Sequence, residues 1–403
     1  MCVVAHSNIR TIAGFVLVLL CVCQIGLLPH PVEAWSIDTH PVIARAAAEL
    51  LPSPWKSFFE YYNWLVNETT SYPDTYYRDA DPNEASRHYV DLEVWTPEDP
   101  STGTLPQAVS EFVIQMESAI RANDWNNVFL DAGRIAHYMA DATQPYHTTV
   151  NYDPLTKDGV GVHQLFESEA AAHLSEFRLA SPADVGLVEP ISNVTAFVLE
   201  TAIESHSFLS DINRTLIEEG LRWSPELTQV AENRVNTAII AAARVWYTAI
   251  VRSGSLPPEL SKVNELSIVV DSVALNSTSY GIVRLHVIDT LGVKTPADVS
   301  LSVDGSTFRG QVANVVPPVG EYVIVVPSGA YNANFVFTAQ KEGYRPAVVT
   351  LPIGTPTTST PIAVVNVPFP TIVALAVMVA ALVALIWYRR RPNYSVPDDL
   401  TDS

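Results

Sequence analysis

Apolar residues recur with a helical period over much of the chain. Four segments place them at i, i+3, i+4 and i+7: HPVIARAAAELL (40–51), QAVSEFVIQMESAIRA (107–122), NVFLDAGRIAHYMADA (127–142) and ENRVNTAIIAAARVWYTAIV (232–251). This spacing puts the apolar side chains on one face of a helix. The pattern predicts an all-α domain over residues 35–254.

The pattern changes near residue 255. Residues 265–352 alternate apolar and polar positions, as in GIVRLHVID, VSLSVDG, EYVIVV and NANFVFTA, and Gly, Asn, Asp and Pro separate these runs. Because alternation with period two is typical of half-buried strands, we expect a small antiparallel β-sandwich of immunoglobulin-like type at 265–352. The segment carries no concentrated catalytic pattern. We interpret it as a spacer or adhesion module whose partner the sequence does not identify.

Residues 1–34 have the features of a secretory signal peptide. Arg10 supplies the positive charge, residues 12–28 form the apolar run, and VEA before Trp35 is an acceptable cleavage site. An uncleaved signal anchor is the alternative. The chain is therefore expected to be exported, with its mature N-terminus at Trp35.

The other end of the chain predicts a membrane anchor. Residues 369–388 are apolar and would be about 30 Å long as a helix, which suits one bilayer crossing. The sequence RRR follows directly and favours a cytoplasmic tail at 389–403. A Pro/Thr-rich stalk at 353–368 precedes the span. We expect a single-pass protein at the cell surface, with its ectodomain on the exported side.

Composition narrows the chemistry. All three cysteines (Cys2, Cys21 and Cys23) lie in the signal segment, so the mature protein would contain neither disulfides nor thiolates. The net charge of −20 argues against a nonspecific nucleic-acid surface, which would be basic. It does not exclude a phosphodiesterase whose bound metal ions supply positive charge locally. Sequons at Asn67, Asn193, Asn213 and Asn276 fall on the exported side and are compatible with glycosylation.

The histidines of the helical domain form a pattern that points to metal binding. His137 and Asp141 are four residues apart on a predicted helix, and so are His163 and Glu167. Residues at i and i+4 share a helix face, so each pair can bind one metal ion or two adjacent ones. The other candidates are His147 just after Pro145, and His40, Asp74 and His88 upstream. One such pair alone is usually an ordinary surface or core pair, but the whole set is the nitrogen and oxygen donor chemistry of zinc. We interpret His173, His206 and His286, which stand apart from this set in the sequence, as ordinary surface or core residues.

These motifs resemble a known family. A Trp at the processed N-terminus, His-x3-Asp-x5-His in HYMADATQPYH (137–147) and His-x3-Glu at His163 are similar to the zinc-dependent phospholipase C of bacterial lecithinase type. The single-strand-specific zinc nucleases of fungi and plants share this core. The resemblance covers about residues 35–254. It implies an all-α phosphodiesterase domain with three zinc ions.

The resemblance also implies which residues bind each ion. The first zinc would take the amino group and carbonyl of Trp35 with His40 and Asp141, and the second would take Asp74, His88, His137 and Asp141. The third would take His147, His163 and Glu167. Asp74 would also steer or deprotonate the attacking water, although Asp79 and Asp81 lie close by. Three dications and three carboxylates leave a net positive centre that suits a phosphate group.

The sequence leaves the substrate open. Glu167 and the short gap between His147 and His163 resemble the phospholipase, whereas the short step from Trp35 to His40 resembles the nucleases. We favour a phospholipase C-like hydrolase acting on phospholipid, with a nuclease acting on single-stranded nucleic acid as the alternative. A non-catalytic, zinc-stabilised adhesion protein is a third interpretation.

Several further residues are candidates near the substrate. Asp38 is a candidate for contacting a headgroup, and Tyr89 for stacking on a base or lining a headgroup pocket. The aromatic segment FFEYYNWL (58–65) could serve either substrate, although core packing is its simplest role.

Overall fold

The computed structural model describes residues 35, 38–78, 80–220, 222–274, 281–303, 306–308, 312–314, 320–326 and 333–353. The predicted signal (1–34), nearly all of the stalk, the membrane span (369–388) and the tail (389–403) lie outside these residues. Within the described residues, no helix has the length and apolar character needed to cross a bilayer.

The part of the chain from Trp35 to Gly254 is helical, as the periodicity predicts. Its α-helices are α2 (Thr39–Glu49), α3 (Trp55–Tyr61), α4 (Asn63–Thr69), α5 (Glu84–Arg87), α6 (Leu105–Ala122), α7 (Trp125–Thr143), α8 (Val162–His173), α9 (Pro182–Val185), α10 (Val194–His206), α11 (Leu209–Asn213) and α12 (Pro225–Ser253). Short 3₁₀ or π turns are η1 (Pro73–Tyr77), η2 (Pro100–Thr102), η3 (Pro145–Thr148), η4 (Leu174–Glu176), η5 (Arg214–Glu219) and, beyond this domain, η6 (Leu260–Lys262).

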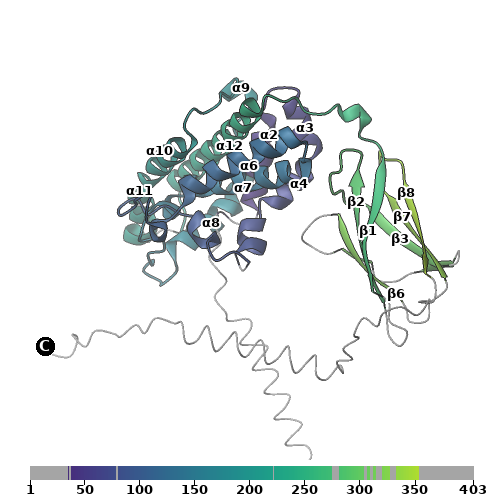
Figure 1. Cartoon of the computed structure of the whole chain (residues 1–403). Helices are drawn as coiled ribbons and strands as arrows, with labels where there is room; N and C mark the ends of the chain where they lie inside the picture. The colour runs from purple at the N-terminus through teal and green to yellow at the C-terminus, as the bar shows by residue number, and fades with distance from the viewer. Residues whose placement is uncertain are drawn as a thin grey trace, which may run out of the picture. The chain divides into compact units, whose positions relative to one another are not determined.

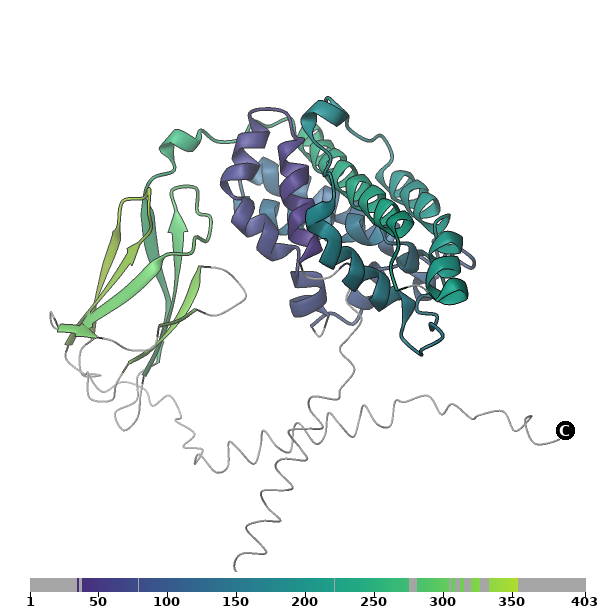
Figure 2. The same cartoon turned by 180° about the vertical axis from the view of Figure 1, so that it is seen from behind.

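Helix α7 forms the centre of the helical domain. It packs against α6, α4 and α12, and these helices lie side by side (Figure 1 and Figure 2). The helix begins where the Asp124 carboxylate accepts a hydrogen bond from the backbone N–H of Asn127, and it ends at Gln144, before Pro145. Most of its side chains are buried, including polar ones. Polar groups inside a packed core need partners, so α7 is where a site is expected.

A glycine allows the close approach of α4 to α7. A Cβ atom at Gly133 would lie 2.0 Å from Oγ1 of Thr69 and 2.8 Å from its backbone carbonyl carbon. The Thr69 hydroxyl donates hydrogen bonds within α4 and also to the carbonyl of Phe129 in α7. This contact fixes the segment that follows α4, where Thr70 and Asp74 lie, against α7.

The second part of the chain forms two four-stranded sheets. The strands are β1 (Leu266–Ala274), β2 (Gly281–Asp289), β3 (Asp298–Val303), β4 (Ser306–Phe308), β5 (Val312–Asn314), β6 (Glu321–Val326), β7 (Ala333–Gln340) and β8 (Ala347–Ile353). The sheet orders are β1-β2-β6-β5 and β4-β3-β7-β8. Strand β2 pairs antiparallel with β1 and β6, and β3 pairs antiparallel with β4 and β7. These orders correspond to the A-B-E-D and C-F-G sheets of immunoglobulin folds, with β4 added beside β3.

Alternation along the strands explains their burial. In β2, Val283, Leu285 and Val287 are buried, and in β7, Phe335 and Phe337 are buried, while residues between them are more exposed. Each sheet therefore has one apolar face, as the sequence pattern predicts.

Candidate metal centre

The structure places eight of the nine predicted site residues together in the helical domain. His40 lies at the start of α2, Asp74 in η1, His88 directly after α5, His137 and Asp141 on α7, His147 in η3, and His163 and Glu167 on α8. All eight side chains are buried. Charged and imidazole side chains are seldom buried together unless something compensates them.

The eight residues form three groups whose ligand atoms could each surround one ion. The groups are His40 with Asp74 and His137, His88 with His137 and Asp141, and His147 with His163 and Glu167. Within each group the ligand atoms lie within 4.8 Å of one another. The third group is the one that the family resemblance implies. In the first, the structure sets His40 beside Asp74 and His137, whereas the resemblance implied Asp141; how the ions share these ligands stays a prediction.

Short distances connect the first two groups. Nδ1 of His88 lies 3.0 Å from Oδ2 of Asp141 and 3.2 Å from Nε2 of His137. The Asp74 carboxylate lies 3.8 Å from both His88 and His137, and the rings of His40 and His137 stack at 4.1 Å. Donor atoms from four separate segments therefore point at one small volume.

Two backbone carbonyls fix the tautomers of the central histidines. Nδ1 of His137 lies 2.7 Å from the carbonyl oxygen of Thr70, and Nδ1 of His147 bonds to the carbonyl oxygen of His88. A carbonyl can only accept, so both Nδ1 atoms carry the proton and both Nε2 atoms keep a lone pair. Metal-binding histidines are commonly oriented in this way.

Several ligand atoms are buried without a hydrogen-bond partner. Within the described part of the chain these include Oδ1 of Asp141, Nε2 of His147 and Nδ1 of His163. Leaving a buried polar atom unpaired costs about 1–3 kcal/mol. Three such atoms in one cluster of nitrogen and oxygen donors fit a site that is completed by metal ions.

A short backbone pairing joins the segment that follows His88 to η3, which carries His147. The N–H of Val90 donates to the carbonyl of His147 at 2.9 Å, and the N–H of Leu92 donates to that of Thr148 at 3.2 Å. On the other side, Gly103 has a φ of +96°, and a Cβ there would lie 2.1 Å from the carbonyl oxygen of Tyr89. Only glycine allows the chain to pass this closely behind the site.

The third group is held by residues outside it. The Gln144 side chain donates from Nε2 to Oε1 of Glu167 at 2.6 Å and accepts from the N–H of Tyr146 at 2.6 Å. The Asp153 carboxylate accepts from the backbone N–H of His163 at 3.0 Å, which caps the start of α8. The two ends of the His147–His163 connection are therefore both anchored.

Burial sets the protonation of the centre. It lowers the pKa of His137 and of His147 well below the usual value, and neighbouring histidines lower both further. Burial raises the pKa of Asp141 to about 7, although its contact with His88 acts in the opposite direction. The imidazoles of His137 and His147 are therefore neutral, which is the form that binds a metal.

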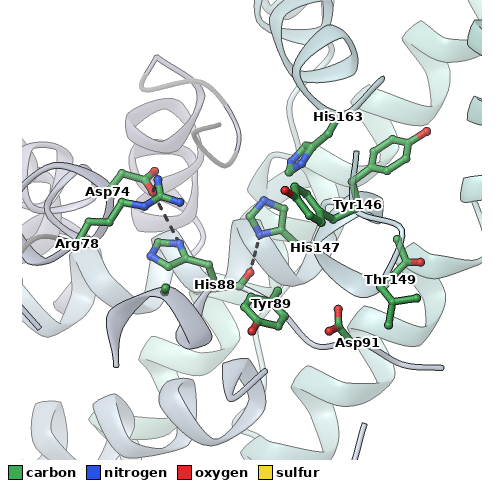
Figure 3. A pocket seen from close by; sticks show the side chains of 12 residues that line it. Asp74, Arg78, His88, Tyr89, Asp91, Tyr146, His147, Thr149 and His163 are labelled. Carbon is green, nitrogen blue, oxygen red and sulfur yellow. Dashed lines mark hydrogen bonds and ion pairs between the residues drawn. The ribbon is translucent and has the colours of Figure 1, made fainter. Parts of the chain in front are cut away.

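Ligands from all three groups line one pocket of about 560 Å³. Figure 3 shows the rings of His88, His147 and His163 facing it, with Asp74 and Arg78 at one end and Asp91 and Thr149 at the other. Ala85, Tyr89, Tyr146, Val150 and Tyr152 also line this pocket. A pocket bounded by ligands leaves room for a further molecule, as catalytic sites require and closed structural sites do not.

The structure places the remaining predicted candidates differently from one another. Trp35 is buried, and its indole N–H donates to the carbonyl of Ala140, the residue before Asp141, at 2.9 Å. Tyr89 lines the pocket, but Asp38 is exposed and is not among the lining residues. Asp79 lies outside the described residues, and Asp81 pairs with Arg87 and belongs to none of the three groups. In the aromatic segment 58–65, Phe58, Phe59, Tyr62 and Leu65 pack in the core.

The other histidines lie outside the three groups, as the sequence suggests. His173 stacks on Trp223, His206 bonds to Thr148, and His286 pairs with Asp271. None of them belongs to a group of potential metal ligands among the described residues.

Sequence reasoning missed Glu84 and Gln144. Glu84 is buried, and its carboxylate contacts Tyr138, Arg87 and His88. Burial would raise the pKa of Glu84, but these three contacts outweigh it and lower the pKa. Glu84 is four residues before His88, which is the same i, i+4 relation that singled out His137 with Asp141. That signal was present in the sequence, whereas Gln144 has no local pattern.

Two solved structures are similar to the chain. The chain is similar to the solved structures of the alpha-toxin of Clostridium perfringens from avian strain SWCP and the alpha toxin of Clostridium absonum. The first is 15% identical with a TM-score of 0.41, covering 80% of this chain and 96% of that one. The second is 14% identical with a TM-score of 0.42, covering 80% and 98%. No protein-family model and no curated protein matches the chain.

Proposed function

We propose that this chain is a zinc-dependent phosphodiester hydrolase of phospholipase C type. The observation that carries the proposal is the convergence of three His–carboxylate groups on one pocket, with buried ligand atoms that lack hydrogen-bond partners among the described residues. Zinc fits because the donors are imidazole nitrogens and carboxylate oxygens and no cysteine contributes. The ligands would be His40, Asp74, His88, His137, Asp141, His147, His163 and Glu167, with the N-terminal group of Trp35 after processing.

Zinc ions held by these residues would supply Lewis acidity, that is, positive charge for phosphate oxygens and a lowered pKa for a water molecule. The chain's own residues would orient and neutralise the reactants. Asp74 lines the pocket and lies 3.3 Å from Nη1 of Arg78, so its carboxylate is held in place. Asp74 would accept the proton of the attacking water, and the Arg78 guanidinium would bind a phosphate oxygen.

Apolar side chains beside the pocket support a lipid substrate. Of the fourteen large apolar side chains that are exposed among the described residues, four lie on residues 150–160: Val150, Tyr152, Leu155 and Val160. Val150 and Tyr152 also line the pocket. This segment is held as a hairpin, because Thr156 N–H donates to the Val160 carbonyl and Val162 N–H donates to the Pro154 carbonyl. Exposed apolar groups this concentrated mark a contact surface for apolar partners.

Two alternatives remain distinguishable by experiment. Tyr89 and Tyr152 both line the pocket, and aromatic faces are what a single-strand nuclease uses to stack bases. A non-catalytic, zinc-stabilised adhesion protein would bind zinc without using the pocket.

We further propose that the enzyme is exported and is tethered at the cell surface by residues 369–388. Tethering would hold the pocket within reach of membrane lipids.

The test is a substrate panel on the purified, zinc-loaded protein. We expect release of a phosphorylated headgroup from phospholipid vesicles, abolished by chelator and by His147→Ala, with slower or no cleavage of single-stranded DNA and RNA. Rapid nucleotide release with no phospholipid turnover would favour the nuclease. Tight zinc binding with no turnover of either substrate would favour the adhesion protein.

A further inference from the structure

Glu84 is a buried carboxylate that borders the candidate metal centre but belongs to none of the three ligand groups. Its side chain is 2% exposed, and it lies on α5, four residues before His88. A buried carboxylate is costly unless hydrogen bonds and opposite charge surround it. Its surroundings therefore indicate what it does.

Two contacts anchor the Glu84 carboxylate. Oε1 accepts a hydrogen bond from the hydroxyl of Tyr138, and Oε2 lies 2.8 Å from Nη1 of Arg87. Tyr138 follows His137 on α7, so this hydrogen bond ties α5 to the helix that carries His137 and Asp141. Arg87 also pairs with Asp81 at 2.7 Å.

The third neighbour is the ring of His88. Its Nδ1 atom faces the second ligand group, 3.0 Å from Asp141, while its Nε2 atom is buried on the other side, 3.7 Å from Oε1 of Glu84. If His88 binds a metal through Nδ1, its proton must sit on Nε2. Glu84 is the acceptor placed to hold that proton.

We propose that Glu84 is a positioning residue that holds His88 in the tautomer and orientation needed to bind zinc through Nδ1. This inference rests on the proposed zinc site. His137 and His147 are oriented by the backbone carbonyls of Thr70 and His88, whereas His88 relies on a side chain for the same purpose. A hydrogen bond needs roughly 2.7–3.2 Å, so ring and carboxylate approach by at least about half an ångström when the bond forms.

The proposal predicts a selective loss of metal affinity. Removing an outer partner of a metal-binding histidine typically weakens metal binding by about 10–100-fold. Glu84→Gln removes the charge at nearly constant size, so we expect one zinc ion per chain to bind about 10–100-fold more weakly. The ion held by His147, His163 and Glu167 should be unaffected, because Glu84 contacts none of these residues among the described contacts.

The experiment is zinc competition with a chromogenic chelator on the purified full-length protein, together with zinc content by elemental analysis. Melting temperature in excess chelator measures the metal-free fold separately, and two-bond ¹H–¹⁵N spectra report the tautomer of His88. The matched control is Asp81→Asn. It removes the second carboxylate that pairs with Arg87, and Asp81 makes no described contact with His88. It should leave zinc affinity unchanged.

The outcomes separate this inference from the proposed function. Parent protein that binds no zinc would overturn both. Parent protein with three zinc ions, together with unchanged affinity in Glu84→Gln or an equal loss in Asp81→Asn, would overturn the role of Glu84 alone. Should Glu84→Gln not fold, Glu84→Asp keeps the charge but withdraws the carboxylate from His88. It is expected to lose zinc affinity, and full affinity in that variant would also overturn the proposal.

Discussion

The Nδ1–H of His147 donates a hydrogen bond to the backbone carbonyl of His88, so two candidate ligands 59 residues apart in sequence are joined directly. His88 belongs to the second ligand group and His147 to the third. The backbone pairing of Val90 with His147 strengthens the same junction. The groups are therefore parts of one rigid centre, and damage to the junction should affect more than one of them.

Zinc content tests the centre most directly. We expect close to three zinc ions per chain. Asp141→Asn should lose more than one if Asp141 bridges two ions, for which both oxygens are placed: Oδ2 lies 3.0 Å from Nδ1 of His88, and Oδ1 is buried without a hydrogen-bond partner among the described residues. Elemental analysis after purification without chelator measures this. His173→Ala, which alters a histidine stacked on Trp223, is the control and should lose none. Absence of zinc in the parent after zinc is supplied would contradict the proposed site.

Gly103 is expected to be essential for the junction. Gly103→Ala should destabilise the fold by about 3 kcal/mol or more, because the new Cβ combines an unfavourable positive φ with a clash against the Tyr89 carbonyl. Gly159 also has a positive φ but has nothing within 4 Å, so Gly159→Ala should cost only about 1–2 kcal/mol. Urea unfolding of both variants measures the difference. Equal losses of stability in the two variants would show that the close packing of Gly103 against the Tyr89 carbonyl does not contribute to the stability of the fold.

The apolar hairpin at 150–160 should affect the rate of hydrolysis only when the substrate is part of a lipid assembly. Leu155 is 62% exposed, so Leu155→Asp should cost little folding stability. If this side chain enters a lipid surface, its loss should lower the rate on vesicles about tenfold more than the rate on a soluble short-chain substrate. Leu187, which is 84% exposed on another segment, is the matched control, and Leu187→Asp should change neither rate. A similar ratio of rates in both variants would argue against membrane contact by this hairpin.

Asp131 should make stability depend on pH. Burial raises the pKa of this α7 carboxyl to about 7, although Arg134 acts in the opposite direction. Because the folded pKa lies above the unfolded value of about 4, the stability that this group contributes is complete below pH ~4 and is lost as pH rises through about 7. Asp131→Asn should therefore match the parent below pH ~4 and melt a few degrees higher at pH 8.

Melting curves in chelator test this prediction, since they exclude changes in metal binding. Asp158→Asn, on the exposed hairpin, is the control and should follow the parent at both pH values. A variant of Asp131 that is less stable than the parent at pH 8 would show that its pairing with Arg134 outweighs the cost of burial.

The N-terminus of the mature protein offers another test. Trp35 bonds to the carbonyl of Ala140, so a terminus at Trp35 would lie close to Asp141. Protein beginning with a retained Met before Trp35 should fold but bind one zinc ion more weakly and be far less active than protein beginning at Trp35. N-terminal sequencing, zinc content and activity measure this. Full activity with the extra residue would exclude the amino group as a ligand.

Local periodicity in the sequence was sufficient to predict the two kinds of architecture and two pairs of candidate ligands. Helix and strand periods are properties of consecutive residues, so the change near residue 255 separates the helical part from the two antiparallel sheets. The pairs His137 with Asp141 and His163 with Glu167 are likewise fixed by helix geometry alone.

Tertiary packing decided how these ligands are combined and oriented. His40 lies with Asp74 and His137 because α2, η1 and α7 meet in the core, and no local pattern encodes that meeting. The tautomers of His137 and His147 depend on carbonyls of residues 67 and 59 positions away. Such contacts arise only when distant segments pack together. The sequence by itself therefore determined which side chains could bind metal, and the folded core decided which of them face one another.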